Sequence, residues 1–201
     1  MTRVAVVFCF LMFFCFCSVA MAGPEVQAPL GFQWGMTVSE VEQLGLGTIQ
    51  NMGGNLYLVH KTPKQLPNTD YASLAFSSKG LVQVAWFSTI VEGESALRVL
   101  MDRYDTIKKT LVEKFGPPEF GGEFFDKNRP KKDIQHFLAC LSEGSNCGMW
   151  KSAWKVNGIY ISVSIAPSSD SGDKGFVGVA YTSLSGMELR AKEQAALKDA
   201  L

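Results

Sequence analysis

The sequence predicts an α+β domain: an antiparallel β-sheet of about six to eight strands, one long amphipathic helix packed on it, a short N-terminal helix and a C-terminal helix. Two observations lead to this fold class. Residues 148–166 alternate apolar and polar side chains on both sides of Asn157-Gly158, which is typical of a β-hairpin. Residues 94–115 repeat apolar side chains every three or four positions, which is typical of an amphipathic helix.

The predicted hairpin has one buried face and one solvated face. Its second strand alternates four β-branched residues with polar ones, namely Ile159, Ile161, Val163 and Ile165. Its first strand carries Trp150 and Trp154, two of the four tryptophans. We interpret both indoles as sheet packing rather than as stacking platforms for bases or sugars, because large aromatic side chains dominate core burial.

Further short strands are expected on both sides of the long helix. They are Phe32–Trp34, a hairpin over residues 47–60, a pair at Tyr71–Phe76 and Leu81–Thr89 in which Val82, Val84 and Trp86 share a face, and Phe176–Thr182. Two capping boxes, Thr37 with Glu40 and Ser185 with Glu188, predict the starts of the N-terminal and C-terminal helices.

The long helix is predicted to lie across the sheet. Its apolar residues fall on one stripe, made of Leu97, Leu100, Tyr104, Ile107, Leu111 and Phe115. The pattern lasts only about three heptads, so a coiled-coil partner is the weaker alternative. Gly116-Pro117-Pro118 then ends the helix.

Residues 119–135 are rich in glycine and polar side chains and are interpreted as an irregular loop. Glu119, Glu123 and Asp126 in this loop are candidates for general acid–base catalysis or for binding a hard cation, but a solvated loop face is favoured because their spacing matches no known ligand loop. Residues 133–141 follow as a short helix or strand.

The first 22 residues are typical of a secretory signal peptide. Arg3 is the only charge before Glu25, residues 4–19 are apolar apart from Ser18, and Ala20-Met21-Ala22 supplies small residues for cleavage after Ala22. An uncleaved membrane anchor is the alternative. Lipidation is not expected, because phenylalanine precedes both Cys15 and Cys17 where lipoprotein processing needs a small residue.

Cleavage would leave a flexible N-terminus at residues 23–30, one α+β domain at 31–185 and a C-terminal helix at 186–201. Of the 19 Lys and Arg residues only Arg3 precedes residue 23, which leaves 18 against 19 Asp and Glu. This balance does not favour nucleic acid or an anionic membrane surface as a partner. No transmembrane segment is expected after cleavage.

Cys140 and Cys147 are the two cysteines outside the leader. An even pair in an exported chain predicts a disulfide, which would contribute about 2–3 kcal/mol by closing a short loop. The alternative is a metal site formed by His136, Cys140 and Cys147, or a Cys140 nucleophile activated by His136 one helical turn away. We identify no catalytic or cofactor-binding residues.

Four motifs occur together in this chain: F-x-W-G-M-T-x-x-x-V from Phe32 to Val41, K-F-G-P-P from Lys114 to Pro118, I-x-V-x-I from Ile161 to Ile165, and V-x-V-x-Y-T-S from Val177 to Ser183. This set resembles small exported bacterial proteins of undefined function, although the chain lacks the lipid-modified cysteine of the lipid-anchored members. The helix ending in F-G-x-P is also similar, over a shorter stretch, to modules of outer-membrane assembly lipoproteins. Neither resemblance implies active-site residues.

The sequence therefore favours a periplasmic or secreted, non-enzymatic module that binds another protein or an envelope component. An immunity protein that neutralises a secreted toxin is the second hypothesis. An enzyme or metal protein that uses His136 and Cys140 is the third.

Overall fold

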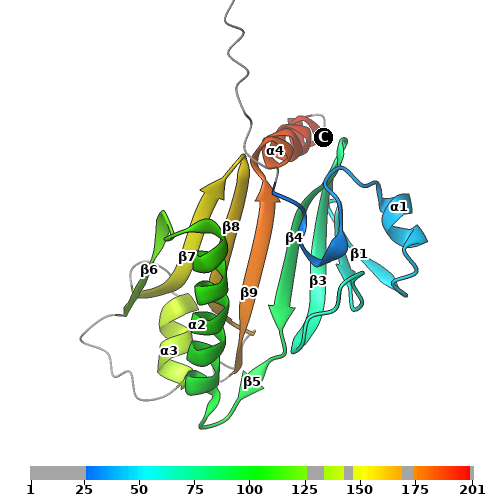
Figure 1. Ribbon diagram of the computed structural model, residues 1–201. Helices are drawn as coiled ribbons and strands as arrows, with labels where there is room; N and C mark the ends of the chain where they lie inside the picture. Colours follow the sequence, from blue (N-terminus) through cyan, green and yellow to red (C-terminus); the bar gives the residue numbers. More distant parts are fainter. Residues whose placement is uncertain (1–25, 126–133, 143–146, 169–173, 200–201) are drawn as a thin grey trace, which may run out of the picture.

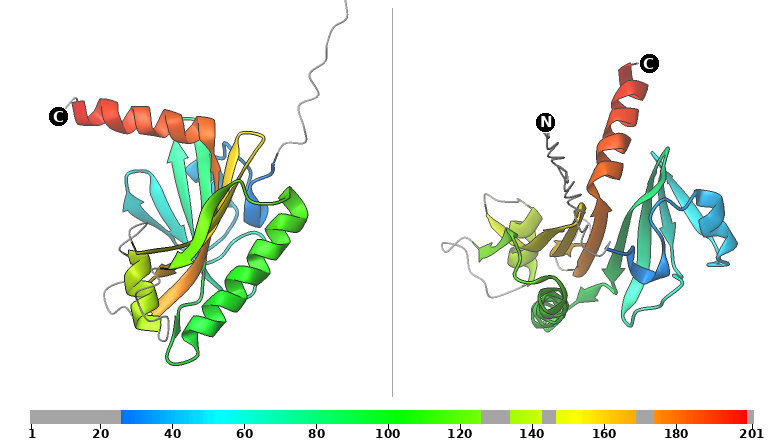
Figure 2. Two further views of the ribbon diagram at one scale, coloured as in Figure 1. Left: turned by 90° about the vertical axis from the view of Figure 1, so that its left-hand side faces the viewer. Right: turned by 45° about the horizontal axis from the view of Figure 1, so that its top comes forward.

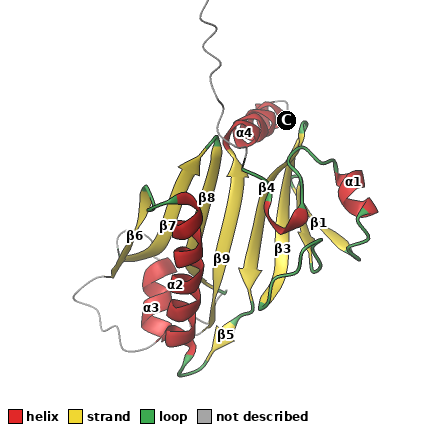
Figure 3. Ribbon diagram, viewed as in Figure 1, coloured by secondary structure: helices red, strands yellow, loops and turns green. Residues whose placement is uncertain are grey.

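Nine antiparallel strands form one twisted sheet in the computed structural model, which describes residues 26–125, 134–142, 147–168 and 174–199 (Figures 1 and 3). The strands are β1 Ile49–Gly53, β2 Leu56–Val59, β3 Thr69–Ser77, β4 Gly80–Ser88, β5 Val91–Glu92, β6 Phe120–Phe125, β7 Gly148–Val156, β8 Ile159–Pro167 and β9 Lys174–Ser183. Their order is β1-β2-β3-β4-β9-β8-β7-β6, and β5 pairs with β9. The helices are the 3-10 turn η1 Pro29–Gly31, α1 Val38–Gln43, α2 Ala96–Phe115, α3 Ile134–Ser142 and α4 Leu184–Asp199. The predicted α+β class is confirmed.

Strand β9 lies at the centre of the sheet and joins two antiparallel units. On one side it pairs with β4, where Val179 lies opposite Trp86, and on the other with β8, where Tyr181 lies opposite Ile161. The predicted hairpin over residues 148–166 forms as β7 and β8, and Asn157 and Gly158 both have positive φ in its turn. The last strand of the chain therefore connects the N-terminal strands to the hairpin.

Two hydrophobic clusters pack against the same sheet. The larger one joins α2 and α3 to the inward-facing residues of β7, β8 and β9, and the smaller one joins the N-terminal segment and α1 to β2, β3 and β4. The predicted apolar stripe of α2 supplies Leu100, Tyr104 and Leu111 to the larger cluster, all three buried. Trp34 and Trp86 are partly buried and contact both clusters, so they mark the seam between them.

The N-terminal segment differs from its prediction in two ways. Phe32–Trp34 is not a strand, because the chain turns at Trp34-Gly35, with Phe32 buried in the smaller cluster. The indole of Trp34 donates a hydrogen bond to the carbonyl of Val26 at 2.8 Å. Residues 26–30 are also packed rather than loose: Val26, Ala28 and Leu30 are buried.

A β-bulge corrects the expected face of β4. Ala75 pairs with Gln83 but Phe76 pairs with Leu81, so Val82 is an extra residue between them. Leu81 and Val84 therefore belong to the smaller cluster, whereas Val82 packs against Gly186 of α4. Val82 does not share a face with Val84 and Trp86, because the bulge reverses the alternation.

The two predicted capping boxes have different outcomes. Thr37 caps α1 as predicted: its hydroxyl accepts from the Glu40 amide at 3.2 Å, and the Glu40 carboxylate accepts from the Thr37 amide at 2.7 Å. The box at Ser185 is wrong, because α4 already begins at Leu184 and the Ser183 hydroxyl accepts from the Gly186 amide at 3.4 Å.

Helix α4 projects from the end of the sheet on the side opposite α2 (Figure 2). It is attached to the strand ends by two polar contacts. Arg190 donates to the carbonyl of Gly54 at 2.8 Å, and the Glu193 carboxylate accepts from the Ser78 amide at 3.1 Å. The rest of its surface is largely exposed, including Leu197, which is 64% exposed.

Candidate functional site

The disulfide predicted between Cys140 and Cys147 is present, with an S–S distance of 1.98 Å and Cα atoms 5.0 Å apart. It joins the buried end of α3 to the start of β7, and it fits an oxidising compartment. His136 lies one turn earlier in α3 with an exposed side chain, whereas Cys140 is fully buried. The Cys140 sulfur is thus occupied by the disulfide and not presented as a nucleophile beside His136.

Within the part of the chain that the structure describes, no three His, Cys, Asp or Glu side chains lie close enough together to hold a metal ion. No described helix is both long enough and apolar enough to span a bilayer.

The predicted acidic loop is wrong over residues 120–125, which form the edge strand β6. Pairing with β7 places Glu123 opposite Trp150 and turns its carboxylate toward α2. The amide of Glu119 donates to the carbonyl of Ala153 at 2.9 Å, which extends this pairing. Asp126 lies outside the described residues.

Glu123 is held in a polar network under α2 rather than in a solvated loop. Its Oε1 accepts from the Tyr104 hydroxyl at 2.8 Å, from the Ser152 hydroxyl at 3.2 Å and from the ammonium group of Lys108. Burial raises the pKa of Glu123, but the hydrogen bonds from Lys108 and Tyr104 outweigh burial and lower it overall. Burial of Tyr104 raises the pKa of its phenol, which stays protonated and serves as a donor.

Replacing Glu123 with glutamine is expected to reduce the free energy of unfolding by about 1 kcal/mol at neutral pH, a value discounted because this carboxylate is 30% exposed. The folded-state pKa is lowered, so the wild-type advantage exists above the unfolded value of about 4.5 and is lost as the pH falls through the folded pKa. Urea unfolding of both proteins across this pH range measures the difference. Glu113→Gln, at an exposed position on α2, is the matched control; an equal loss there would contradict the role of the network.

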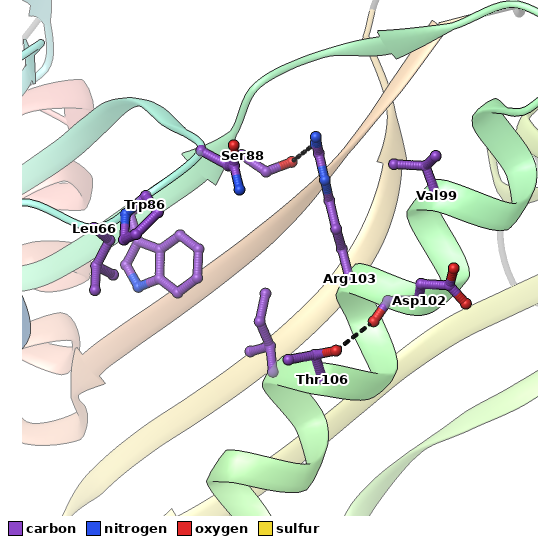
Figure 4. A pocket seen from close by; sticks show the side chains of 10 residues that line it. Leu66, Trp86, Ser88, Val99, Asp102, Arg103 and Thr106 are labelled. Carbon is purple, nitrogen blue, oxygen red and sulfur yellow. Dashed lines mark hydrogen bonds between the residues drawn. The ribbon is translucent and has the colours of Figure 1, made fainter.

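A hollow of ligand size on the described surface is a groove between α2 and β4. Its volume is about 420 Å³. The residues lining it come from α2, β4 and the loop before β3, and are Leu66, Pro67, Asn68, Trp86, Ser88, Val99, Asp102, Arg103, Thr106 and Ile107 (Figure 4). We call it the α2–β4 groove. It lies at the seam between the two hydrophobic clusters, where the partly buried indole of Trp86 forms part of its wall.

Helical periodicity explains the α2 wall of the groove. Val99, Arg103 and Ile107 are spaced four residues apart and therefore lie on one face of the helix. This face borders the apolar stripe of α2 that packs on the sheet, and Ile107 belongs to both. The wall consequently carries one cation between two aliphatic side chains.

Arg103 is fixed at one end of the groove by β4 and the residue after it. Its Nη1 donates to the carbonyl of Thr89 at 2.7 Å and to the hydroxyl of Ser88 at 3.3 Å. Ser88 is buried; its own hydroxyl donates to the carbonyl of Thr89 at 3.2 Å and accepts from the Val177 amide at 3.0 Å. The guanidinium is therefore held in position by groups that are themselves bonded to the central strands.

Sequence reasoning did not find this site. It placed Trp86 on a strand face and the polar residues of α2 on a solvated helix face. Only the tertiary packing that places α2 beside the end of β4 brings Trp86 and Arg103 to one groove. A usable signal was the arginine four residues from both Val99 and Ile107, between two aliphatic side chains at helical spacing.

Comparison of the chain with protein-family models, with curated proteins and with solved structures finds no match.

Proposed function

We propose that this chain is an exported periplasmic binding module, not an enzyme, and that the α2–β4 groove holds an apolar group of an envelope component. Two observations support the location. The first 22 residues have the composition of a signal peptide cleaved after Ala22. The bond between Cys140 and Cys147 is the kind that persists in oxidising compartments.

The groove is the observation that carries the binding role. Sites for small ligands are concave, about 300–1,000 Å³ in volume, and mostly apolar with a few fixed polar groups. The α2–β4 groove has this composition: Leu66, Trp86 and Ile107 supply apolar surface, and Arg103 supplies a fixed polar group. Trp86 is well suited to such a wall, because a rigid aromatic ring offers a large contact area at a low cost in conformational entropy.

The polar groups at the groove favour binding over catalysis. The Ser88 hydroxyl donates its proton to the carbonyl of Thr89, which is not a base that activates it as a nucleophile. Arg103 is anchored by the same carbonyl. Ser88 therefore holds Arg103 in place, and Arg103 is the polar group that can orient a ligand.

Filling the groove is the test of this function. The protein is purified from the periplasmic fraction and titrated with the fluorescent apolar probe N-phenyl-1-naphthylamine. We expect saturable binding of one probe per chain and at least a tenfold loss of affinity in Val99→Trp, because the indole occupies the groove. Lys109→Trp, on an exposed part of α2, is the matched control and should bind as the wild type does.

Two results would contradict the proposal. Absence of probe binding would exclude the groove as the binding site. Equal binding to Val99→Trp and Lys109→Trp would exclude it too, provided that both variants keep the wild-type circular dichroism. An intact mass that retains residues 1–22 would contradict export with cleavage after Ala22.

A further inference from the structure

We propose that the ligand of the α2–β4 groove is a single-chain fatty carboxylate, with its head on Arg103 and its hydrocarbon chain against Trp86, Leu66 and Ile107. The inference rests on the proposed function, because it takes the groove as the binding site. It adds the charge of the ligand, the shape of its head and the nature of its apolar part.

The free donors of Arg103 define the head group. A guanidinium has five N–H donors in a rigid fork. Only Nη1 is used within the protein, on Thr89 and Ser88. Nε and Nη2 hydrogen-bond to no described residue, and together they form the edge that binds a carboxylate through two parallel bonds.

Arg103 also has no direct counter-ion among the described residues. Its side chain is nevertheless half-buried. Asp102 is its neighbour in the chain, but that carboxylate is exposed and points away from Trp86 (Figure 4). A half-buried cation without a counter-charge is stabilised most by an anion that reaches the same groove.

One unit of negative charge matches this site better than two. Among the residues that the structure describes, no second cationic side chain lines the groove beside Arg103. A carboxylate carries a single charge and a planar pair of oxygens, which the Nε and Nη2 edge can satisfy completely. A phosphate monoester carries about 1.5 to 2 charges and three oxygens at neutral pH, and would remain partly unpaired here.

The walls favour a hydrocarbon chain over a peptide. Strand β4 is paired on both sides, with β3 and with β9, so it offers no free edge to an extended backbone. The carbonyl of Asn68 already accepts from the Thr89 amide at 2.8 Å, and Pro67 has no N–H. A peptide would lose backbone hydrogen bonds to water without replacing them, whereas a hydrocarbon chain has none to lose.

Calorimetric titration with ligands that share one chain and differ in the head tests the inference. Decanoate, decanol and decyl phosphate are added below their micelle concentrations to the wild type, to Arg103→Gln and to the control Lys109→Gln. We expect decanoate to bind the wild type roughly 10- to 100-fold more tightly than decanol, the effect of hydrogen bonds to a charged group. This preference should fall to about twofold or less in Arg103→Gln and persist in Lys109→Gln.

Arg103→Lys separates the contribution of the two parallel guanidinium donors from the contribution of the positive charge. It keeps the cation but loses the two parallel donors, so the preference for decanoate should fall to an intermediate value. Thermal melting of each variant shows whether the fold is kept. If Arg103→Gln does not fold, the comparison of decanoate with decanol on the wild type, together with Arg103→Lys, still decides the question.

Each remaining outcome counts against a specific claim. Equal binding of decanoate and decanol to the wild type would overturn the anionic head while leaving the apolar groove. Tighter binding of decyl phosphate than of decanoate would overturn the carboxylate. Tighter binding of the peptide Leu-Leu-Leu than of decanoate would overturn the hydrocarbon chain. No binding of decanol in the groove, together with failure of the fluorescent probe, would overturn the proposed function itself.

Discussion

Replacing Trp154 with alanine is expected to lower the free energy of unfolding by about 3–5 kcal/mol, the usual cost of removing a large buried aromatic side chain. Trp154 is 1% exposed and lies on β7 inside the larger cluster. Its indole also donates to the carbonyl of Gly116 at 2.8 Å, the residue that follows α2. The substitution therefore leaves a cavity and an unpaired carbonyl at the same place.

Urea unfolding of Trp154→Ala and Trp154→Phe separates these two contributions. Trp154→Phe keeps an aromatic ring but has no N–H, so its free energy of unfolding should fall by about 1–3 kcal/mol. Trp150→Ala is the matched control on the same strand, and a smaller loss is expected there because Trp150 is only partly buried. A loss below about 1 kcal/mol for Trp154→Ala would contradict its role in anchoring the helix end.

Replacing Gly80 with alanine is expected to cost at least about 3 kcal/mol, because two backbone segments meet at this residue. Gly80 has φ +93°, and an added Cβ would lie 2.1 Å from the carbonyl oxygen of Gly35. That segment cannot withdraw freely. The Gly35 amide donates to the carbonyl of Leu81 at 3.0 Å, and the Leu81 amide donates to the carbonyl of Met36 at 2.7 Å.

Gly93→Ala is the control that isolates the clash at Gly80. Gly93 also has a positive φ, +85°, but an added Cβ there would meet nothing within 4 Å. Its cost should be limited to backbone strain, about 1–2 kcal/mol. Thermal and urea unfolding of both variants measure the difference. Equal losses would show that the close approach of Gly35 to Gly80 adds nothing.

The parts of the fold that local sequence decides were predictable. Residues 148–166 form a hairpin because their alternation and Asn157-Gly158 specify the same register. The disulfide followed from the even number of cysteines outside the predicted signal peptide. Helix α2 followed from its apolar spacing, since side chains repeated every three or four residues form one apolar face of a helix.

The parts that long-range packing decides were not predictable. Strand β6 contains two consecutive glycines and exposes Phe120 and Phe124, so its sequence does not alternate buried apolar and exposed polar side chains. It is a strand because β7 supplies a pairing edge and Tyr104 and Lys108 bind Glu123 from above. Val82 reads as part of an alternating strand, and only the pairing of β4 with β3 reveals the bulge.

The candidate site also depends on long-range packing and was not predictable from local sequence. Arg103 looks like one more charged residue on a solvated helix face, and its partners Ser88 and Thr89 lie 14 or 15 residues away in the chain. No residue spacing in the sequence indicates that the Arg103 side chain reaches the end of β4. The groove arises only once the two hydrophobic clusters are assembled side by side.

The central position of β9 sets the order in which the molecule can be completed. The N-terminal strands and the β7–β8 hairpin are both local structures, but residues 174–183 must arrive before either gains its second neighbour. Until then β4 and β8 each present an unprotected edge to other chains. Because a chain is synthesised from its N-terminus, the interval before residues 174–183 emerge is the time of greatest exposure to aggregation, and a chaperone would have to act then.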